Sequence, residues 1–266
     1  MEFDISKMDL NAQEFRRFDL AVNTGDTEVV KMMLKEKHVD VNKENVFKET
    51  LFWTACRKGH LAIVKLLLED PRVDVNRVKS GGVSPFFVAC ENGHLDVVKT
   101  LLENDRIQVH QERWDRCTPF FIACLFGHIE IVKLLLKDPR VDLSTNRLDG
   151  LSPLIIASRE GNFEVVKWLL ASERLENCEN LNPCGKKKSI VETFQEAKES
   201  KNVRYQEAQD EGSKCQETCL KLLKRFEENP SLVRQEIREE LGILSRRACD
   251  IFAAIVLYTD EYLDLI

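Results

Sequence analysis

The sequence SPFFVACENGHLDVVKTLL, residues 84–102, contains a pattern that recurs along most of the chain. One glycine of the pattern returns every 34 residues, as Gly25, Gly59, Gly93, Gly127 and Gly161. An alanine before each glycine, and a Val-Val or Ile-Val pair after it, keep the same interval. A fixed period near 33 residues is typical of a stacked repeat array, in which each copy is one supersecondary unit. The period therefore indicates a solenoid.

Each copy predicts two short helices that are joined at the glycine. The first helix begins after a hydroxyl residue, which can accept hydrogen bonds from the N–H groups of the first turn; these residues are Thr50, Ser84, Thr118 and Ser152. Proline follows three of them, at the first helical position, where its missing N–H costs nothing. The second helix has apolar residues at helical spacing, as in residues 61–68. Because so small a pair cannot bury its apolar face alone, neighbouring copies must stack.

Residues 84–89 (SPFFVA), Gly93-His94 and residues 73–76 (VDVN) resemble the ankyrin repeat, whose pattern is T-P-L-H-x-A, then G-H, then D-V-N. The resemblance covers about residues 10–180. One departure concerns the histidine of the first motif, which is replaced by Trp53, Phe87, Phe121 and Ile155. We therefore expect the hydrogen bonds that this histidine makes between copies to be absent, with bulkier apolar packing in their place.

The resemblance implies an all-α ankyrin-repeat solenoid, a stack of helix-turn-helix-loop units with short β-hairpin-like loops and a C-terminal helical cap. The expected segments are a leader (1–10), the repeats (11–180), a degenerate sixth repeat with a charged insertion (181–227) and a C-terminal helical pair (228–266). Within the array the copies are about 11–42, 43–76, 77–110, 111–144 and 145–178, here called copies one to five. The polar first copy, with Arg16, Arg17 and Asp19, is expected to cap the N-terminal end.

The end of the chain departs from the repeat. Ile190 and Val191 match the start of a sixth copy, but residues 196–214 are highly charged and fit either a lengthened helix or a solvated loop. Pro230 and Gly242 bound one further helix, and a second is expected over about 246–265. These helices cap the open end of the stack in the simplest interpretation. A docking or dimerisation helix is the alternative, which an exposed apolar stripe would favour.

Composition limits the class of protein. The net charge of −6 argues against non-specific nucleic-acid binding. Nine cysteines in a chain of this length indicate reduced thiols, so we expect the cytoplasm, with the nucleus as an alternative. No signal peptide is evident, and the longest apolar run, residues 251–258, is too short for a bilayer, which needs about 20 residues. A soluble monomer is expected.

No cofactor, metal or catalytic residue is predicted, because the chain lacks a Gly-rich phosphate loop, G-x-S-x-G and H-E-x-x-H. Cys56, Cys90 and Cys124 recur at 34 residues and are interpreted as buried packing. Zinc held by Cys178, Cys184, Cys215 and Cys219 is a weaker alternative, because their spacings differ from C-x2-C. The histidines His60, His94 and His128 are one per copy and are expected to bond to loop backbone.

The resemblance also implies a site. Family members hold other proteins on a concave surface made by the loop tips and the last residues before each glycine. Copy four is apolar at three of these positions, Trp114, Leu125 and Phe126, where polar residues are usual. The predicted protein-binding residues are Phe47, Arg57, Lys79, Arg113, Trp114, Leu125, Phe126, Arg147, Leu148 and Arg159. Aromatic anchors bordered by arginine are typical of interface hot spots. Alternatively, Leu125 and Phe126 fold back between copies and Trp114 covers a neighbouring loop.

The predicted function is a non-catalytic scaffold or adaptor that binds a protein or peptide on the concave surface. Lys79, Arg113 and Arg147 border the apolar residues, so acidic residues are expected in the partner. Nucleic acid is a weaker candidate for this basic stripe, because three charges are few on an acidic protein. The alternative function is a regulatory or targeting subunit that docks a catalytic partner, or self-associates, through its C-terminal helices.

Overall fold

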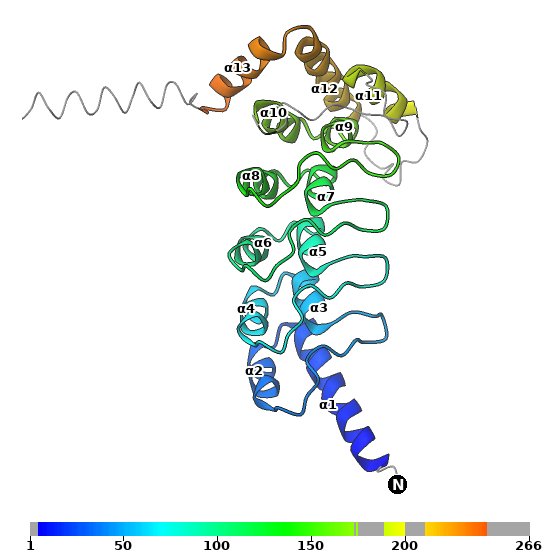
Figure 1. The fold of residues 1–266 in the computed structure, drawn as a ribbon, viewed down its shortest axis with the longest axis vertical. Coiled ribbons are helices and arrows are strands. Elements are labelled where there is room, and N and C mark those ends of the chain that lie inside the picture. The colour runs from blue at the N-terminus through cyan, green and yellow to red at the C-terminus, as the bar shows by residue number, and fades with distance from the viewer. Residues whose placement is uncertain (1–4, 173, 175–188, 200–210, 244–266) are drawn as a thin grey trace, which may run out of the picture.

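In the computed structural model, which describes residues 5–172, 174, 189–199 and 211–243, helices stack in pairs along one axis (Figure 1). The first helices of copies two to five form one column beside the loops, and the second helices form another (Figure 1). We call them inner and outer helices. The expected all-α stack of helix pairs is confirmed.

The helices fall into three groups. Copy one contains α1 (Ile5–Thr24) and α2 (Thr27–Lys35). In copies two to five the inner and outer helices are α3 (Leu51–Lys58) with α4 (Leu61–Glu69), α5 (Pro85–Glu91) with α6 (Leu95–Leu102), α7 (Pro119–Leu125) with α8 (Ile129–Lys137), and α9 (Pro153–Arg159) with α10 (Phe163–Ala171). The last group is α11 (Ile190–Glu199), α12 (Glu211–Glu228) and α13 (Pro230–Glu240).

The inner helices begin as the sequence predicts. The hydroxyls of Thr50, Ser84, Thr118 and Ser152 each accept a hydrogen bond from the backbone N–H three residues later, at 3.1–3.3 Å. The loops before them are hairpin-like, because one bond recurs across each: Lys79 N–H donates to the Val83 carbonyl at 3.0 Å, and Arg113 and Arg147 do the same to Cys117 and Leu151. The packed interior contains fully buried phenylalanines, among them Phe52, Phe86, Phe87, Phe120 and Phe121.

Histidines tie each copy to the one before it. Nε2 of His94 lies 2.9 Å from the Arg57 carbonyl oxygen, and Nε2 of His128 lies 3.0 Å from that of Glu91. Asn162 takes this place in copy five, where Nδ2 donates to the carbonyls of Cys124 and Leu125. The expectation that these histidines bond to backbone is confirmed, but the acceptors lie in the last turns of α3 and α5 and not in loops. The amide of Asn162 continues the series.

Arginines form a second series of bonds between copies. Arg72 donates to the carbonyls of Leu34 and Glu36, Arg140 to that of Leu102, and Arg174 to those of Leu136 and Asp138. In each pair the acceptor lies at the end of the preceding outer helix, where carbonyls have no partner within the helix. An arginine of one copy therefore caps the outer helix of the copy before it.

One sequence prediction is wrong at Trp53. Replacement of the motif histidine by Trp53 was expected to remove the hydrogen bond between copies. Instead, the indole Nε1–H of Trp53 donates to the carbonyl of Val83 in the next copy at 3.0 Å. The indole N–H is a donor on an otherwise apolar ring, so Trp53 forms a hydrogen bond to the loop of the next copy while its ring packs in the interior. At Phe87 and Phe121, which are buried and have no donor, packing replaces the bond as expected.

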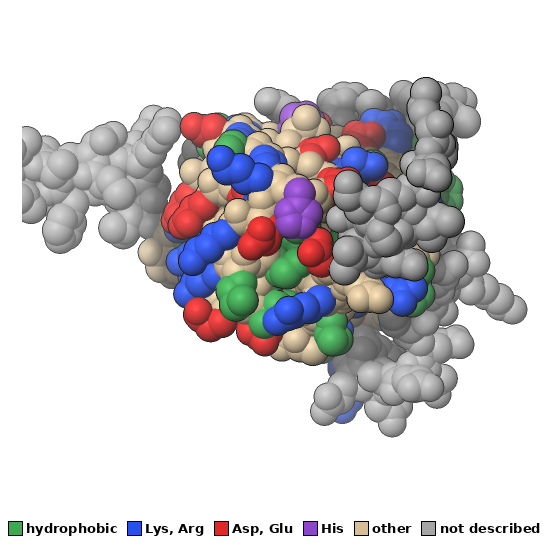
Figure 2. All heavy atoms as spheres, turned by 90° about the horizontal axis from the view of Figure 1, so that it is seen from below, with side chains coloured by type: hydrophobic (Ala, Val, Ile, Leu, Met, Phe, Trp, Pro, Cys, Tyr) green, Lys and Arg blue, Asp and Glu red, His purple; other side chains and the backbone are tan. Residues whose placement is uncertain are grey.

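The N-terminal boundary also differs from the prediction. Residues 1–10 were expected to form a leader, but α1 begins at Ile5, since no glycine or proline interrupts residues 5–24. The end of the stack, seen in Figure 2, mixes acidic and basic side chains with scattered apolar ones. Such a polar face is what a terminal repeat needs.

At the other end the sixth helix pair completes the stack. α11 packs on α9, and α12 packs on α10 and α11. Cys219 and Leu223 of α12 are fully buried. The charged insertion is helical on both sides, to Glu199 and from Glu211, while residues 200–210 lie outside the described residues.

α13 lies against α10 and α12 with Val233 and Ile237 buried. The second C-terminal helix, expected over about 246–265, lies outside the described residues. None of the helices in the described part of the chain has the length and apolarity needed to cross a membrane.

Candidate protein-binding surface

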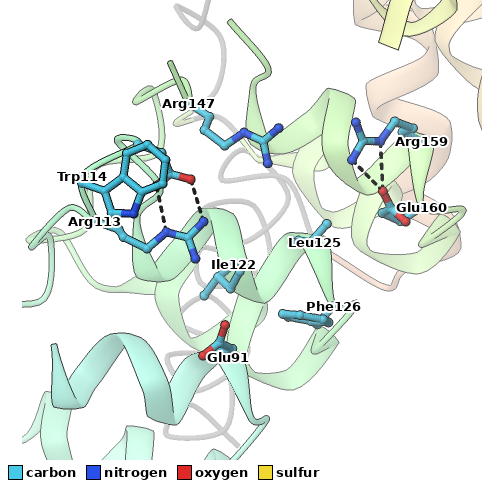
Figure 3. Close-up of a pocket in the computed structure, with 10 residues that line it drawn as sticks. Glu91, Arg113, Trp114, Ile122, Leu125, Phe126, Arg147, Arg159 and Glu160 are labelled. Carbon is cyan, nitrogen blue, oxygen red and sulfur yellow. Dashed lines mark hydrogen bonds and ion pairs between the residues drawn. The ribbon is translucent and has the colours of Figure 1, made fainter. Parts of the chain in front are cut away.

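A hollow of about 440 Å³ opens on the concave side of copies three to five (Figure 3). We call it the copy-four hollow. It is lined by Glu91, Arg113, Trp114, Asp115, Ile122, Leu125, Phe126, Arg147, Arg159 and Glu160. Six of the ten predicted site residues are among these: Arg113, Trp114, Leu125, Phe126, Arg147 and Arg159. The structure therefore gathers most of the predicted surface into one concavity.

Trp114 stands at the rim of the copy-four hollow with 73% of its surface exposed. Its backbone N–H donates to the Gly81 carbonyl at 3.1 Å. A Cβ added to Gly81 would lie 3.3 Å from Cδ1 of the indole, so one edge of Trp114 rests on the copy-three loop. The indole both covers a neighbouring loop and presents a large apolar surface to solvent.

Leu125 and Phe126 form part of the floor. Both are half-buried and pack against the hydrophobic core. The Phe126 ring is tilted against that of His128, with centroids 6.1 Å apart. Each of these residues therefore packs against the core and also lines the hollow.

The basic stripe is paired within the chain. Arg113 donates through Nε and Nη2 to the two oxygens of the Asp115 carboxylate, at 2.9 and 2.6 Å. Arg147 donates through the same two nitrogens to one oxygen, Oδ2, of Asp149. Each guanidinium also lies over a phenylalanine of the preceding copy, Phe87 and Phe121, at 5.6 and 5.7 Å. Their charges are therefore matched by nearby groups before any partner arrives.

These ion pairs affect ionisation. Burial opposes the charged form of Asp115, but hydrogen bonds from Arg113 and from the Cys117 N–H outweigh it, so the pKa of Asp115 is lowered. The Asp115 hydrogen bond raises the pKa of Arg113. Both groups stay charged at neutral pH, and the fork holds the guanidinium in a fixed orientation.

Arg159 is similarly engaged. It is 7% exposed and donates through Nε to Glu160 at 2.9 Å. Figure 3 places this pair at the far side of the hollow from Trp114.

The model of the family described as ankyrin repeats (3 copies) matches residues 18–113 and 105–180. The chain belongs to the ankyrin repeat family. Ankyrin repeats are generally protein–protein interaction modules, and the family is typically non-catalytic. No curated protein matches the chain significantly.

The other four predicted residues lie outside the copy-four hollow. Arg57 and Lys79 converge on Glu49, at 3.3 and 2.7 Å, and both lie over the Trp53 ring. Phe47 and Leu148 are exposed ankyrin loop-tip residues, at 68% and 56%. Leu148 is joined to the copy-four loop by its N–H, which donates to the Asp115 carbonyl at 3.0 Å. The predicted set therefore comprises the hollow, a polar cluster around Glu49 and two separate tips.

Glu91 is not among the ten predicted protein-binding residues, although its place two residues before Gly93 belongs to the concave surface that the resemblance implies. It is half-buried at the end of α5 and lines the hollow. Burial raises the pKa of Glu91, partly offset by the positive charge of Arg113. The equivalent positions in ankyrin copies two, four and five are Arg57, Leu125 and Arg159. The sequence feature that could have identified Glu91 is therefore a single acid in a series of basic and apolar residues.

Among the thiols that the structure describes in this ankyrin chain, Cys215 is exposed and the other five are buried packing groups. Cys56, Cys90 and Cys124 are fully buried, and burial raises their pKa. Thiols that stay protonated are poor nucleophiles and poor metal ligands. Within the described residues no three His, Cys, Asp or Glu side chains lie close enough to hold a metal ion. Cys178 and Cys184, of the weaker zinc alternative, lie outside the described residues.

Proposed function

We propose that this chain is a non-catalytic scaffold or adaptor that binds a segment of a partner protein in the copy-four hollow. The observation that carries the proposal is Trp114, a large aromatic side chain that is 73% exposed beside an apolar floor. Tryptophan is among the residue types that contribute most of the binding energy at protein interfaces. The family membership supports the same class of function.

The surroundings of Trp114 suit a protein segment. The floor is apolar at Ile122, Leu125 and Phe126, and the rim carries the ion pairs of Arg113 and Arg147. An apolar centre with a polar rim is the usual composition of a protein interface. Because the rim arginines are already paired with Asp115 and Asp149, acidic residues in the partner are not part of this proposal.

Affinity capture with quantitative mass spectrometry tests the proposal. The full chain, its Trp114→Ala variant and its Phe47→Ala variant are each used as bait. Phe47 is a matched control because it is an aromatic loop-tip residue of similar exposure, 68%, outside the hollow. We expect Trp114→Ala to lower capture of at least one partner by about tenfold or more, the effect of losing a hot-spot side chain.

Phe47→Ala should leave capture of that partner unchanged. Circular dichroism of both variants checks that they remain folded, as expected for exposed side chains. Equal capture by the wild type and Trp114→Ala would contradict the proposal. Equal losses in both variants would instead assign binding to the loop tips in general.

A further inference from the structure

The charged groups of the copy-four hollow are unequally satisfied. Its three arginines each have a carboxylate partner: Arg113 with Asp115, Arg147 with Asp149, and Arg159 with Glu160. The carboxylate of Glu91 is different, since it forms no ion pair or hydrogen bond within the part of the chain that the structure describes. Only the backbone carbonyl of Glu91 is engaged, by His128.

The surroundings of Glu91 make an unpaired charge costly. Its carboxylate points toward Ile122, and Phe126 lies beside it on the floor (Figure 3). The side chain is half-buried, and burial raises the pKa of Glu91. The charge of Arg113 offsets this burial only in part, without a hydrogen bond or ion pair, so an incoming cation would stabilise the carboxylate further.

The aromatic groups around the hollow suit the same cation. Trp114 stands at the rim and Phe126 on the floor. The chain already places guanidinium groups over aromatic rings on this side, as Arg113 over Phe87 and Arg147 over Phe121. A planar guanidinium stacks on aromatic faces and is more weakly hydrated than an ammonium group, so arginine fits better than lysine.

An acidic partner group fits less well. It would have to share an arginine whose charge is already matched by Asp115, Asp149 or Glu160. It would also bring a second negative charge toward Glu91. Like charges brought together in a partly dehydrated site cost free energy, so the balance of charges favours a cation.

We propose that the copy-four hollow recognises a basic side chain, arginine in preference to lysine, in the bound partner segment, with Glu91 as its counter-ion and Trp114 as its aromatic wall. This inference rests on the proposed function, because it names what the same hollow selects. The equivalent positions Arg57, Leu125 and Arg159 carry no acid, so the selectivity belongs to one point along the stack.

A random linear-peptide display library tests the inference with the full chain as it exists. Selections run in parallel on the wild type and on Trp114→Ala, Glu91→Gln and Glu112→Gln. Gln is isosteric with Glu, and Glu112 is the control because it is an acid of the copy-four loop, which carries Trp114, and does not line the hollow. The best wild-type peptide is then synthesised with arginine, with citrulline, its neutral isostere, and with glutamate at its shared position.

We expect Trp114-dependent peptides that share one basic position. Citrulline there should weaken binding to the wild type by about tenfold or more, as should Glu91→Gln with the arginine peptide, because each removes one partner of a charge pair. On the Glu91→Gln variant, citrulline should add little further loss. Glu112→Gln should bind the arginine peptide as the wild type does.

Two results overturn the inference, and they are distinguishable. Trp114-dependent peptides that lack a basic position, prefer glutamate or tolerate citrulline would refute the basic selectivity and leave the proposed function standing. Selections that yield no Trp114-dependent peptide would refute the proposed function and the inference with it.

Discussion

At the scale of single residues, the repeating glycine has two roles. Gly59 ends α3 in the left-handed region, with φ +74°. A Cβ added to Gly59 would lie 2.5 Å from Nδ1 of His94, the side chain that bonds copy three back to copy two. The glycine therefore permits both the turn and the close approach of the next copy. Gly93 and His128 repeat the arrangement, with 2.7 Å to Cε1.

Because the glycine also permits the close approach of the next copy, alanine substitutions at Gly59 and Gly242 should lower the free energy of unfolding by different amounts. Gly242 also has positive φ, +67°, but a Cβ there would meet nothing within 4 Å. Gly242→Ala should cost only the left-handed strain, about 1 kcal/mol. Gly59→Ala should cost at least about 2 kcal/mol, because strain adds to displacement of the histidine ring. Urea unfolding of both variants measures the difference. Equal losses would mean that the His94 ring moves aside freely.

At the scale of elements, α13 supplies what the array lacks at its end. The outer helices α2, α6 and α8 each receive an arginine from the next copy, and α10 has no regular successor. Instead Nε of Arg234 donates to the Leu170 carbonyl at 3.1 Å, and Nε of Arg238 to that of Ala171 at 3.0 Å. Lys167 of α10 binds Glu240 at 2.8 Å. These contacts favour a cap over a docking helix for α13.

The cap predicts a local effect of one core substitution. Ile237 of α13 is 3% exposed, so Ile237→Ala should destabilise its surroundings by about 2–4 kcal/mol through lost packing and a cavity. Because stability in a solenoid passes mainly between neighbours, amide hydrogen exchange should accelerate in α10 and α12 and stay unchanged in α3.

Leu232 provides the control on the same helix. It is 50% exposed, so Leu232→Ala should change the free energy of unfolding by under about 0.5 kcal/mol and should leave amide hydrogen exchange nearly unchanged. If both substitutions leave α10 unchanged, α13 does not hold the end of the stack, and a docking role for the helix regains support.

At the scale of the whole molecule, the repeat period predicts most of the fold. Hydroxyl caps, the proline at the first helical position and the glycine joint are local signals, and each occurs in phase in several copies, so the helices of copies two to five follow from the sequence. The prediction was weakest where no period guides it. The start of α1 at Ile5 is one example, and the hydrogen bond of Trp53 is another.

The site could be predicted only in part. Leu125 and Phe126 stand out because the equivalent residues of copies two, three and five are polar or charged. Trp114 stands out by its size, at a position that is Val46, Ser80 and Leu148 in the other copies. The ion pairs of Arg113 and Arg147 involve residues two positions along the same loop, and only the loop conformation brings the side chains together. Glu91 could be recognised as unpaired only after the partners of its neighbours were known.

Paired carboxylates also determine how the whole stack responds to acid. The pKa is lowered for Asp70, Asp115, Asp138 and Asp142. The hydrogen bond from Arg72 is the main cause at Asp70, and that from Arg140 at Asp138. In the folded state these carboxylates take up protons only at a pH below their ordinary pKa of about 4, whereas in the unfolded chain they take up protons near that pH. Their contribution to stability is present above that value and lost as pH falls through the lowered values.

The free energy of unfolding should therefore decline below about pH 4, the ordinary carboxyl pKa. Glu91 works in the opposite direction, because its raised pKa favours the folded state at low pH, but four lowered groups outweigh it. Asp70→Asn should lower stability at pH 7 and make the acid decline shallower, since one titrating partner of Arg72 is removed. Asp96→Asn, at an exposed position of α6, should reproduce the wild-type curve. Urea unfolding from pH 7 to pH 3 measures all three proteins, and a wild-type stability that rises toward acid would show that the arginine–aspartate pairs do not stabilise the stack.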